Sequence, residues 1–323
     1  MSGQNDHENL EMKPHRSFDM TRKTDRMTLA PLTRRQFLCA SAQAAVLSLV
    51  PSAAFCTAQE AASKAAWRPR LALSSVMFPD LSLPAFCEQA AGLGFIGIDL
   101  WCPFGKCRHL AEAQVLGADG FRRLLARHKL QIGCWTTYRT SGHMEGFPAY
   151  AEFIGQCGGG VVVRESEYGK FPREQLADGM RKFFAKLQPE IDLARKQRVR
   201  LAIENHADAL LGTLDSVRQF RTLNPAPDVV GIALAGYHLQ GAGIPVEEAV
   251  RLCGDQLLFF YAWQKGNGFD QLPGHGPTDF KPWLQALADI GYQGWLTPFM
   301  HGEEPASAMV QAVAKARAYI KSR

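Results

Sequence analysis

The chain has 323 residues, of which 46% are hydrophobic and 21% are charged, a composition that excludes a disordered, collagenous or coiled-coil protein. The formal net charge of +5 is small for this length, so we expect no nucleic-acid partner. No apolar run approaches the length of about 20 residues that a helix needs to span a bilayer. Eight cysteines are too few for a disulfide scaffold. Cys102 and Cys107 share one predicted loop. Two alternatives stay open for this pair, a disulfide between them and two buried thiols.

Residues 1–58 have the pattern of an export leader. A twin-arginine segment at 33–38 (TRRQFL) comes before an apolar stretch of small residues at 39–55. This order is typical of a Tat signal peptide, so we expect export through the Tat machinery to the periplasm or beyond the cell, with no stable membrane insertion after cleavage. We therefore treat 59–69 as a linker and expect one domain over 70–323.

Eight short apolar runs recur along the rest of the chain, as is typical of parallel strands covered on both faces. They predict strands over 71–77, 95–101, 130–138, 161–165, 200–206, 229–238, 257–263 and 295–301. Helical patterns between them predict helices over 83–93, 119–128, 148–157, 173–197, 213–223, 245–253, 279–290 and 305–321. Thr213 and Thr278 stand where the N-caps of two of these helices belong.

The order of these elements predicts the fold. Each strand follows the last after about 24 to 39 residues, as βαβ units require. Eight such units match an α/β fold, a (β/α)8 TIM barrel of about 250 residues. An open doubly wound sheet is the alternative, but no GxGxxG motif opens a helix after the first strand. We therefore predict a TIM barrel that forms a single domain.

Polar and aromatic residues follow the predicted strands, at the end of a TIM barrel where active sites lie. Aromatic faces stack on the C–H faces of sugar rings, while amide, imidazole and carboxylate groups bind hydroxyls. This mixture favours a small carbohydrate over an anionic phosphate or a lipid. The residues that we expect to bind this substrate are Trp101, Tyr138, Asn205, Tyr261, Trp263, Lys265 and His301.

Glu204 lies in an apolar strand, where a carboxylate without a partner is costly. We therefore expect it to be catalytic together with His206 and His238. With His301, these residues form a candidate site for a divalent metal such as Zn, Mn, Fe or Ni. The alternative is a metal-free site in which histidine and glutamate act as an acid/base pair.

Four segments together carry a family resemblance: 94–100 (GFIGIDL), 201–206 (LAIENH), 230–238 (VGIALAGYH) and 291–297 (GYQGWLT). In this order and spacing, the chain resembles the xylose isomerase-like TIM barrels. That superfamily contains sugar isomerases and epimerases and also endonuclease IV. The resemblance covers most of 70–322.

The resemblance implies a metal site that this chain has only in part. The family usually binds one divalent metal through four ligands; the metal polarises a sugar carbonyl while a carboxylate moves the proton. Glu204 matches the first ligand, but the other three positions fall on Ala235, Tyr261 and Thr297. His238 matches a histidine that contacts substrate in the epimerases. One carboxylate alone does not hold a divalent ion tightly.

Two functions therefore stay open at this point. The resemblance implies an exported isomerase, epimerase or related lyase that acts on a sugar or an oxidised sugar by proton transfer next to a carbonyl. The missing ligands favour the alternative, a non-catalytic carbohydrate-binding or interaction protein on a degenerate isomerase barrel. DNA repair of the endonuclease IV type is disfavoured, because it needs a larger ligand set and a basic groove.

Overall fold

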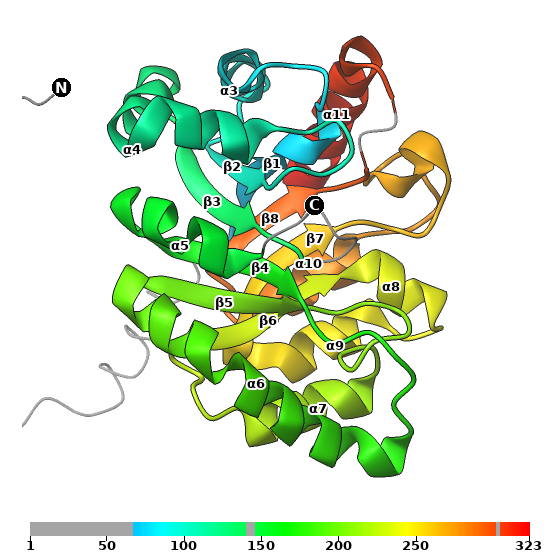
Figure 1. The fold of residues 1–323 in the computed structure, drawn as a ribbon. Coiled ribbons are helices and arrows are strands. Elements are labelled where there is room, and N and C mark those ends of the chain that lie inside the picture. Colours follow the sequence, from blue (N-terminus) through cyan, green and yellow to red (C-terminus); the bar gives the residue numbers. More distant parts are fainter. Residues whose placement is uncertain (1–66, 140–145, 302–303) are drawn as a thin grey trace, which may run out of the picture. The chain divides into compact units, whose positions relative to one another are not determined.

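The computed structural model describes residues 67–139, 146–301 and 304–323, so the predicted leader lies outside the described residues. In the described part, eight parallel strands form a closed barrel in chain order, which confirms the predicted TIM barrel (Figure 1). The strands are β1 (Arg70–Ser74), β2 (Gly97–Trp101), β3 (Gln131–Thr136), β4 (Gly160–Glu165), β5 (Val199–Glu204), β6 (Val230–Ala235), β7 (Leu257–Ala262) and β8 (Trp295–Pro298).

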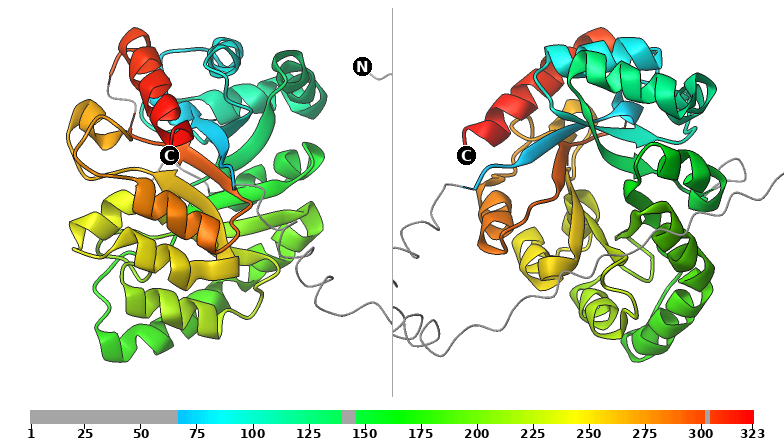
Figure 2. Two further views of the ribbon diagram at one scale, coloured as in Figure 1. Left: turned by 180° about the vertical axis from the view of Figure 1, so that it is seen from behind. Right: turned by 90° about the vertical axis from the view of Figure 1, so that its left-hand side faces the viewer.

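Helices surround the strands, as the right-hand view of Figure 2 shows. They are α3 (Leu83–Gly92), α4 (His109–His128), α5 (Phe147–Gln156), α6 (Leu176–Gln197), α7 (Leu214–Leu223), α8 (Gly236–Gly241), α9 (Val246–Cys253), α10 (Lys281–Asp289) and α11 (Ala306–Lys321). Helix α4 begins earlier than predicted and contains a kink at Gly117, whose φ is 70°. Within the described ranges, no helix has the length and apolar character that crossing a membrane requires.

One of the two predicted helix caps is confirmed. The Thr213 side chain accepts from the backbone N of Ser216 at 3.1 Å, and the Ser216 hydroxyl accepts from the backbone N of Thr213 at 2.9 Å, which forms a capping box. The prediction for Thr278 is wrong, because α10 begins at Lys281 and the backbone N of Thr278 instead donates to the Gln264 side chain at 2.9 Å.

The indole of Trp295 fills the barrel where the strands begin. A Cβ added at Gly97 would lie 2.4 Å from this indole, and one at Gly133 would lie 3.1 Å from it. The Arg70 guanidinium covers the same ring at 4.1 Å from its centre. The glycines of two neighbouring strands thus make room for one large side chain of a third strand.

Replacing Gly97 with alanine is expected to lower the free energy of unfolding by about 1–3 kcal/mol, because the added methyl group overpacks this layer. Gly92→Ala is the matched control, since a Cβ there meets no described atom within 4 Å. In the last turn of α3, alanine should be neutral or should stabilise by about 0.5–1 kcal/mol. Chemical denaturation of both variants checks the prediction, and equal stabilities would contradict it.

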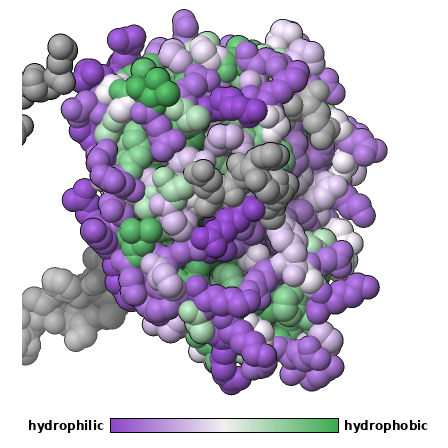
Figure 3. All heavy atoms as spheres, viewed as in Figure 1, coloured by the Kyte–Doolittle hydropathy of each residue, from purple (hydrophilic) through white to green (hydrophobic). Residues whose placement is uncertain are grey.

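The face in Figure 3 is mainly hydrophilic, with hydrophobic residues in small separate areas. Large hydrophobic side chains are exposed at Ile96, Val115, Leu116 and Tyr168. Cys102 and Cys107 are not joined in a disulfide, and burial raises the pKa of each thiol to about 11.

Candidate active site

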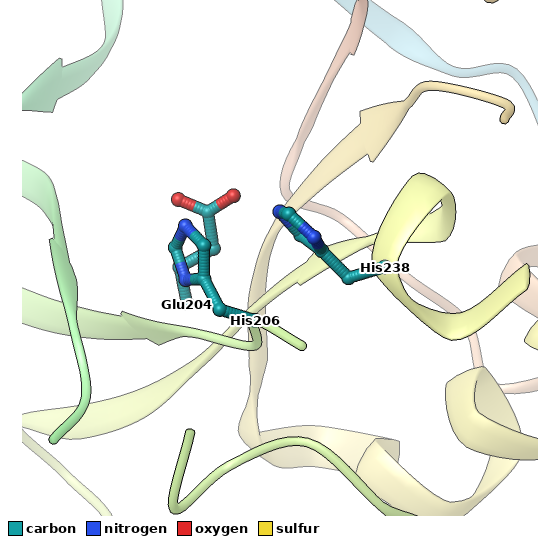
Figure 4. A group of neighbouring side chains, drawn as sticks. All are labelled: Glu204, His206 and His238. Atoms are coloured by element: carbon teal, nitrogen blue, oxygen red, sulfur yellow. The ribbon is translucent and has the colours of Figure 1, made fainter. Parts of the chain in front are cut away.

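Three of the predicted residues meet at the barrel mouth, the end where the strands' carboxyl ends lie. Glu204 ends β5, His206 follows two residues later, and His238 lies on α8, so that the side chains point toward one another (Figure 4). One possible ligand atom from each residue lies within 4.8 Å of the other two. The two imidazole ring centres are 4.5 Å apart. These three residues form the cluster on which the rest of the site is built.

The cluster faces a cavity of about 200 Å³. Its walls are mainly aromatic, with the polar groups concentrated at the cluster. Seven predicted site residues line it, together with three that were not predicted. The lining residues are Trp101, Phe104, Tyr138, Tyr168, Glu204, His206, His238, Trp263, Phe299 and His301.

Three residues predicted to bind substrate do not line this cavity. The Asn205 amide is buried and bridges two strands, because it bonds both the N and the O of Ala235, at 2.6 Å and 3.2 Å. The Tyr261 hydroxyl lies inside the barrel, 3.2 Å from the hydroxyl of Thr136. The Lys265 side chain is exposed. Asn205 thus holds the start of α8, and with it His238, in place.

The predicted strand positions of all three histidines are wrong, and His206 already lies two residues beyond the end of β5. His238 follows β6 on the short helix α8, since the strand ends at Ala235. His301 lies beyond the end of β8 and is not among the ligand atoms of the cluster. Its ring stacks on Phe104 at 5.4 Å and meets the edge of Trp263 at 5.5 Å. The candidate metal site therefore has three protein donors instead of four.

Glu204 is 3% exposed, and the Tyr138 hydroxyl donates to its Oε2. Burial raises the pKa of Glu204 to about 8; the bond from Tyr138 lowers it, and the nearby charge of Glu165 raises it. At neutral pH, the metal-free protein therefore keeps this carboxyl group largely protonated. A carboxyl group with a pKa this close to neutrality is typical of catalytic sites.

The two imidazoles are shifted in the opposite direction. Burial lowers the pKa of His206 to about 4. Burial, together with the charges of His206 and His301, lowers the pKa of His238 to about 3. Both rings are therefore neutral at pH 7, which leaves a nitrogen lone pair on each for a proton or a metal.

Two more buried carboxylates lie close to the cluster, and neither was predicted as a site residue. Asp99, on β2, accepts from Ser74 at 2.8 Å, Trp101 at 2.7 Å and Thr136 at 2.7 Å. Burial raises the pKa of Asp99 to about 6, although these three hydrogen bonds act to lower it. Asp99 thereby fixes the indole of Trp101, which forms a cavity wall.

Glu165 is the second of these carboxylates. It is 5% exposed, and its Cα is paired with that of Glu204 across β4 and β5. Its Oε1 accepts from the backbone N of Arg139 at 3.2 Å. The signal that identified Glu204, a carboxylate in an apolar strand, is also present for Asp99 and Glu165 and applies equally to them.

The three-donor cluster fits a divalent metal. Two imidazoles and one carboxylate are a common set for catalytic zinc and for other transition metals, with coordination positions left open for substrate or water. Nδ1 of His206 is buried and has no hydrogen-bond partner among the described residues. A cation at the cluster would also displace the proton from Glu204.

The three further positions at which the sequence resemblance implied metal ligands offer little to a metal. Ala235, Tyr261 and Thr297 are paired Cα to Cα across β6, β7 and β8. Ala235 has no donor atom, and the Thr297 hydroxyl donates to the carbonyl of Pro298 at 3.1 Å. A metal in this chain would therefore depend on the histidines that follow the strands, His206 and His238.

The pKa of Glu204 predicts how the stability of the metal-free protein depends on pH. Since burial raises it from 4.5 to about 8, the folded state binds a proton that the unfolded chain has released. The contribution of Glu204 to stability should then fall as pH rises through this window, by on the order of 1–2 kcal/mol from pH 6.5 to 8. His206 and His238 partly offset this fall near pH 6.5, because their lowered pKa values leave them neutral in the folded state while the unfolded imidazoles, with a pKa of 6.5, are still partly protonated.

Urea denaturation in EDTA at several pH values from 6.5 to 8 measures this effect. Glu204→Gln removes the titrating group and should remove the fall in stability over the same range. Parallel curves for the wild type and the variant would contradict the assigned protonation state.

Fold and site together define a TIM barrel with a buried carboxylate–imidazole cluster at its mouth. A family model described as xylose isomerase-like TIM barrel matches residues 87–322. The chain belongs to this family. No match is found among curated proteins.

Several solved structures share the fold. The IOLI protein with a binding zinc atom has a TM-score of 0.61 and 17% identity, covering 78% of this chain and 98% of its own. The 3-keto-D-glucoside 4-epimerase YcjR from E. coli has a TM-score of 0.58 and 17% identity. The match covers 78% of this chain and 100% of the epimerase. D-psicose 3-epimerase in the presence of D-fructose has a TM-score of 0.58 and 16% identity. The match covers 77% of this chain and 97% of that epimerase.

Proposed function

We propose that this protein is a sugar isomerase or epimerase that transfers a proton next to the carbonyl of a sugar or an oxidised sugar. The observation that carries the proposal is the cluster of Glu204, His206 and His238, in which groups with oppositely shifted pKa values lie within 4.8 Å. The names of two similar structures, both sugar epimerases, and the zinc of a third support it.

The aromatic walls of the cavity orient the sugar. The rings of Trp101 and Phe299 stack at 5.7 Å, and Trp263 meets the edge of Phe299 at 5.0 Å. The C–H faces of a sugar ring pack on such surfaces, while its hydroxyls and its carbonyl turn toward the cluster. The walls also exclude water from the carbon that loses its proton.

In the metal-free form of the site, the ionised fraction of Glu204 is the base in this proposal. It accepts the proton from carbon at Oε1, while the Tyr138 hydroxyl keeps donating its hydrogen bond to Oε2. With a pKa of about 8, it is a stronger base than an ordinary carboxylate and can also return the proton. His206 and His238 are neutral and can accept or share protons from the substrate hydroxyls.

In the metal-bound form of the site, Glu204, His206 and His238 would hold the divalent metal, and Glu204 would be a ligand in place of the base with a pKa of about 8. When bound, it would polarise the sugar carbonyl and so acidify the neighbouring C–H bond. Zn, Mn, Fe and Ni all suit this mixture of imidazole and carboxylate donors.

A carbohydrate-binding protein without catalysis is the competing function. It is favoured by one observation, that the usual ligand positions hold Ala235, Tyr261 and Thr297. The test is incubation of the protein in D₂O with a panel of ketoses and oxidised sugars, with each metal in turn, followed by NMR. Exchange of the C–H next to the carbonyl supports the enzyme. Saturable binding without exchange under every metal condition would overturn it.

We also infer that residues 1–58 direct export by the Tat pathway. The support is the twin-arginine segment at 33–38 and the apolar stretch after it. Replacing Arg34 and Arg35 together with lysine should retain the full-length chain in the cytoplasm. Unchanged export of that variant would refute the inference.

A further inference from the structure

A second cavity adjoins the active-site cavity on its outer side. It has a volume of about 680 Å³, compared with about 200 Å³ for the inner one. Phe104 and His301 line both cavities, and their rings stack at 5.4 Å with an angle of 25° between the planes. This stacked pair is the shared wall between the two spaces.

The two volumes indicate a ligand larger than one sugar ring. Pockets for small molecules usually have about 300–1,000 Å³. The inner cavity alone, at about 200 Å³, is smaller than this range, and the two cavities together fall inside it. A substrate that fills both spaces has one ring at the cluster and a second group beyond the Phe104–His301 pair.

The inner parts of the outer cavity's wall are held in place before any ligand binds. His109 is buried and donates from Nε2 to the carbonyl of Leu81 at 2.8 Å, which joins the loops after β1 and β2. Its Nδ1 lies 3.4 Å from the thiol of Cys107, and Phe104 and Cys107 pair their backbones as an antiparallel bridge. A wall that is already ordered loses little entropy when a ligand binds.

The polar groups of the outer cavity suit a neutral ligand with hydroxyl groups. Asp80 and Glu304 offer carboxylate oxygens, and the charge of Lys106 is paired with Asp80 at 3.6 Å. Pro79 and Pro305 add apolar surface for C–H groups. The described lining thus has more negative than positive charge, which disfavours a phosphate.

We propose that the outer cavity binds a sugar or another neutral group that is joined by a glycosidic bond to the reacting sugar. The substrate is then a neutral glycosylated sugar, and neither a free monosaccharide nor a sugar phosphate. The assignment rests on the proposed function for the placement of the reacting ring at Glu204. Two sources share this chemistry: a reducing disaccharide, and a glycoside oxidised to a ketone in its ring.

Calorimetric titration of the full chain tests the proposal with four probes: D-fructose, the disaccharide maltulose, D-fructose 6-phosphate, and methyl β-glucoside oxidised to a ring ketone. Maltulose should bind at least about tenfold more tightly than D-fructose, because it alone of these two reaches the outer cavity. The phosphate should bind no more tightly than D-fructose. Tighter binding of the oxidised glucoside than of D-fructose identifies a ring ketone as the reacting group, because neither of these two probes fills the outer cavity.

Two double variants locate the effect. Asp80→Ala with Glu304→Ala should bring the ratio of the two sugar affinities close to one. Asp255→Ala with Asp289→Ala removes two surface carboxylates that pair with arginines elsewhere, and it should keep the ratio. Equal affinity for maltulose and D-fructose in the wild type, or an unchanged ratio in the first double variant, would overturn the proposal.

These outcomes are separate from those of the proposed function. Affinity does not require turnover, so a preference for maltulose survives even if no C–H exchange is found. Conversely, exchange with equal affinities would leave the proposed function standing and remove only the outer binding site.

Discussion

Replacing Glu204 with glutamine is expected to lower kcat by about 10³-fold, the usual scale for loss of a positioned general base. Glutamine keeps the shape of the side chain and an acceptor for the Tyr138 hydroxyl, but it cannot take a proton from carbon. Because it mimics the protonated carboxyl group, the variant should fold. The measurement is single-turnover and steady-state kinetics on the best substrate from the exchange panel.

Glu152→Gln is the control for this variant, because Glu152 is exposed on α5 away from the barrel mouth. It should have wild-type kcat and wild-type thermal stability. If Glu204→Gln keeps kcat within tenfold of the wild type while folded, the assignment of the base is wrong.

The second large effect concerns the metal. His206→Ala removes one of the three donors and should weaken the binding of Zn²⁺ by about 10²-fold or more, since even the groups that support ligands usually contribute 10- to 100-fold. His238→Ala should have an effect of similar size. Competition with a chromophoric chelator at pH 7.5 measures both affinities.

His128→Ala is the matched histidine control, since His128 lies in the last turn of α4 and outside the cluster. Its Zn²⁺ affinity should equal that of the wild type. Equal affinities in all three variants would show that the metal binds elsewhere or nonspecifically.

The barrel can be predicted from the sequence because its strands are buried on both faces and read as continuous apolar runs. The ends of the elements are harder to predict. The predicted strand continues through Gly236, Tyr237 and His238, whereas in the structure α8 begins at Gly236, next to a residue that is held by a contact far away in the sequence. This contact is the bridge from Asn205 to Ala235.

The residues of the cluster can be predicted from the sequence, whereas the residues that line the cavity around it are harder to predict. Glu204 is recognisable because a carboxylate in an apolar strand needs a function or a partner. Asn205 and Tyr261 have the same strand-end position, yet their polar groups are used inside the protein. Which residue faces the cavity depends on register and rotamer, and the sequence does not reveal these. Phe104 enters the cavity from a loop, for which no periodicity gives a signal.

X-ray absorption spectroscopy at the zinc edge of the zinc-loaded protein shows whether Glu204, His206 and His238 act as one centre. We expect one zinc per chain, two imidazole nitrogens at about 2.0–2.1 Å and oxygen ligands beside them. In Glu204→Gln, the two imidazole nitrogens should remain. A spectrum with sulfur ligands, with no imidazole, or with no zinc retained at all would contradict this expectation.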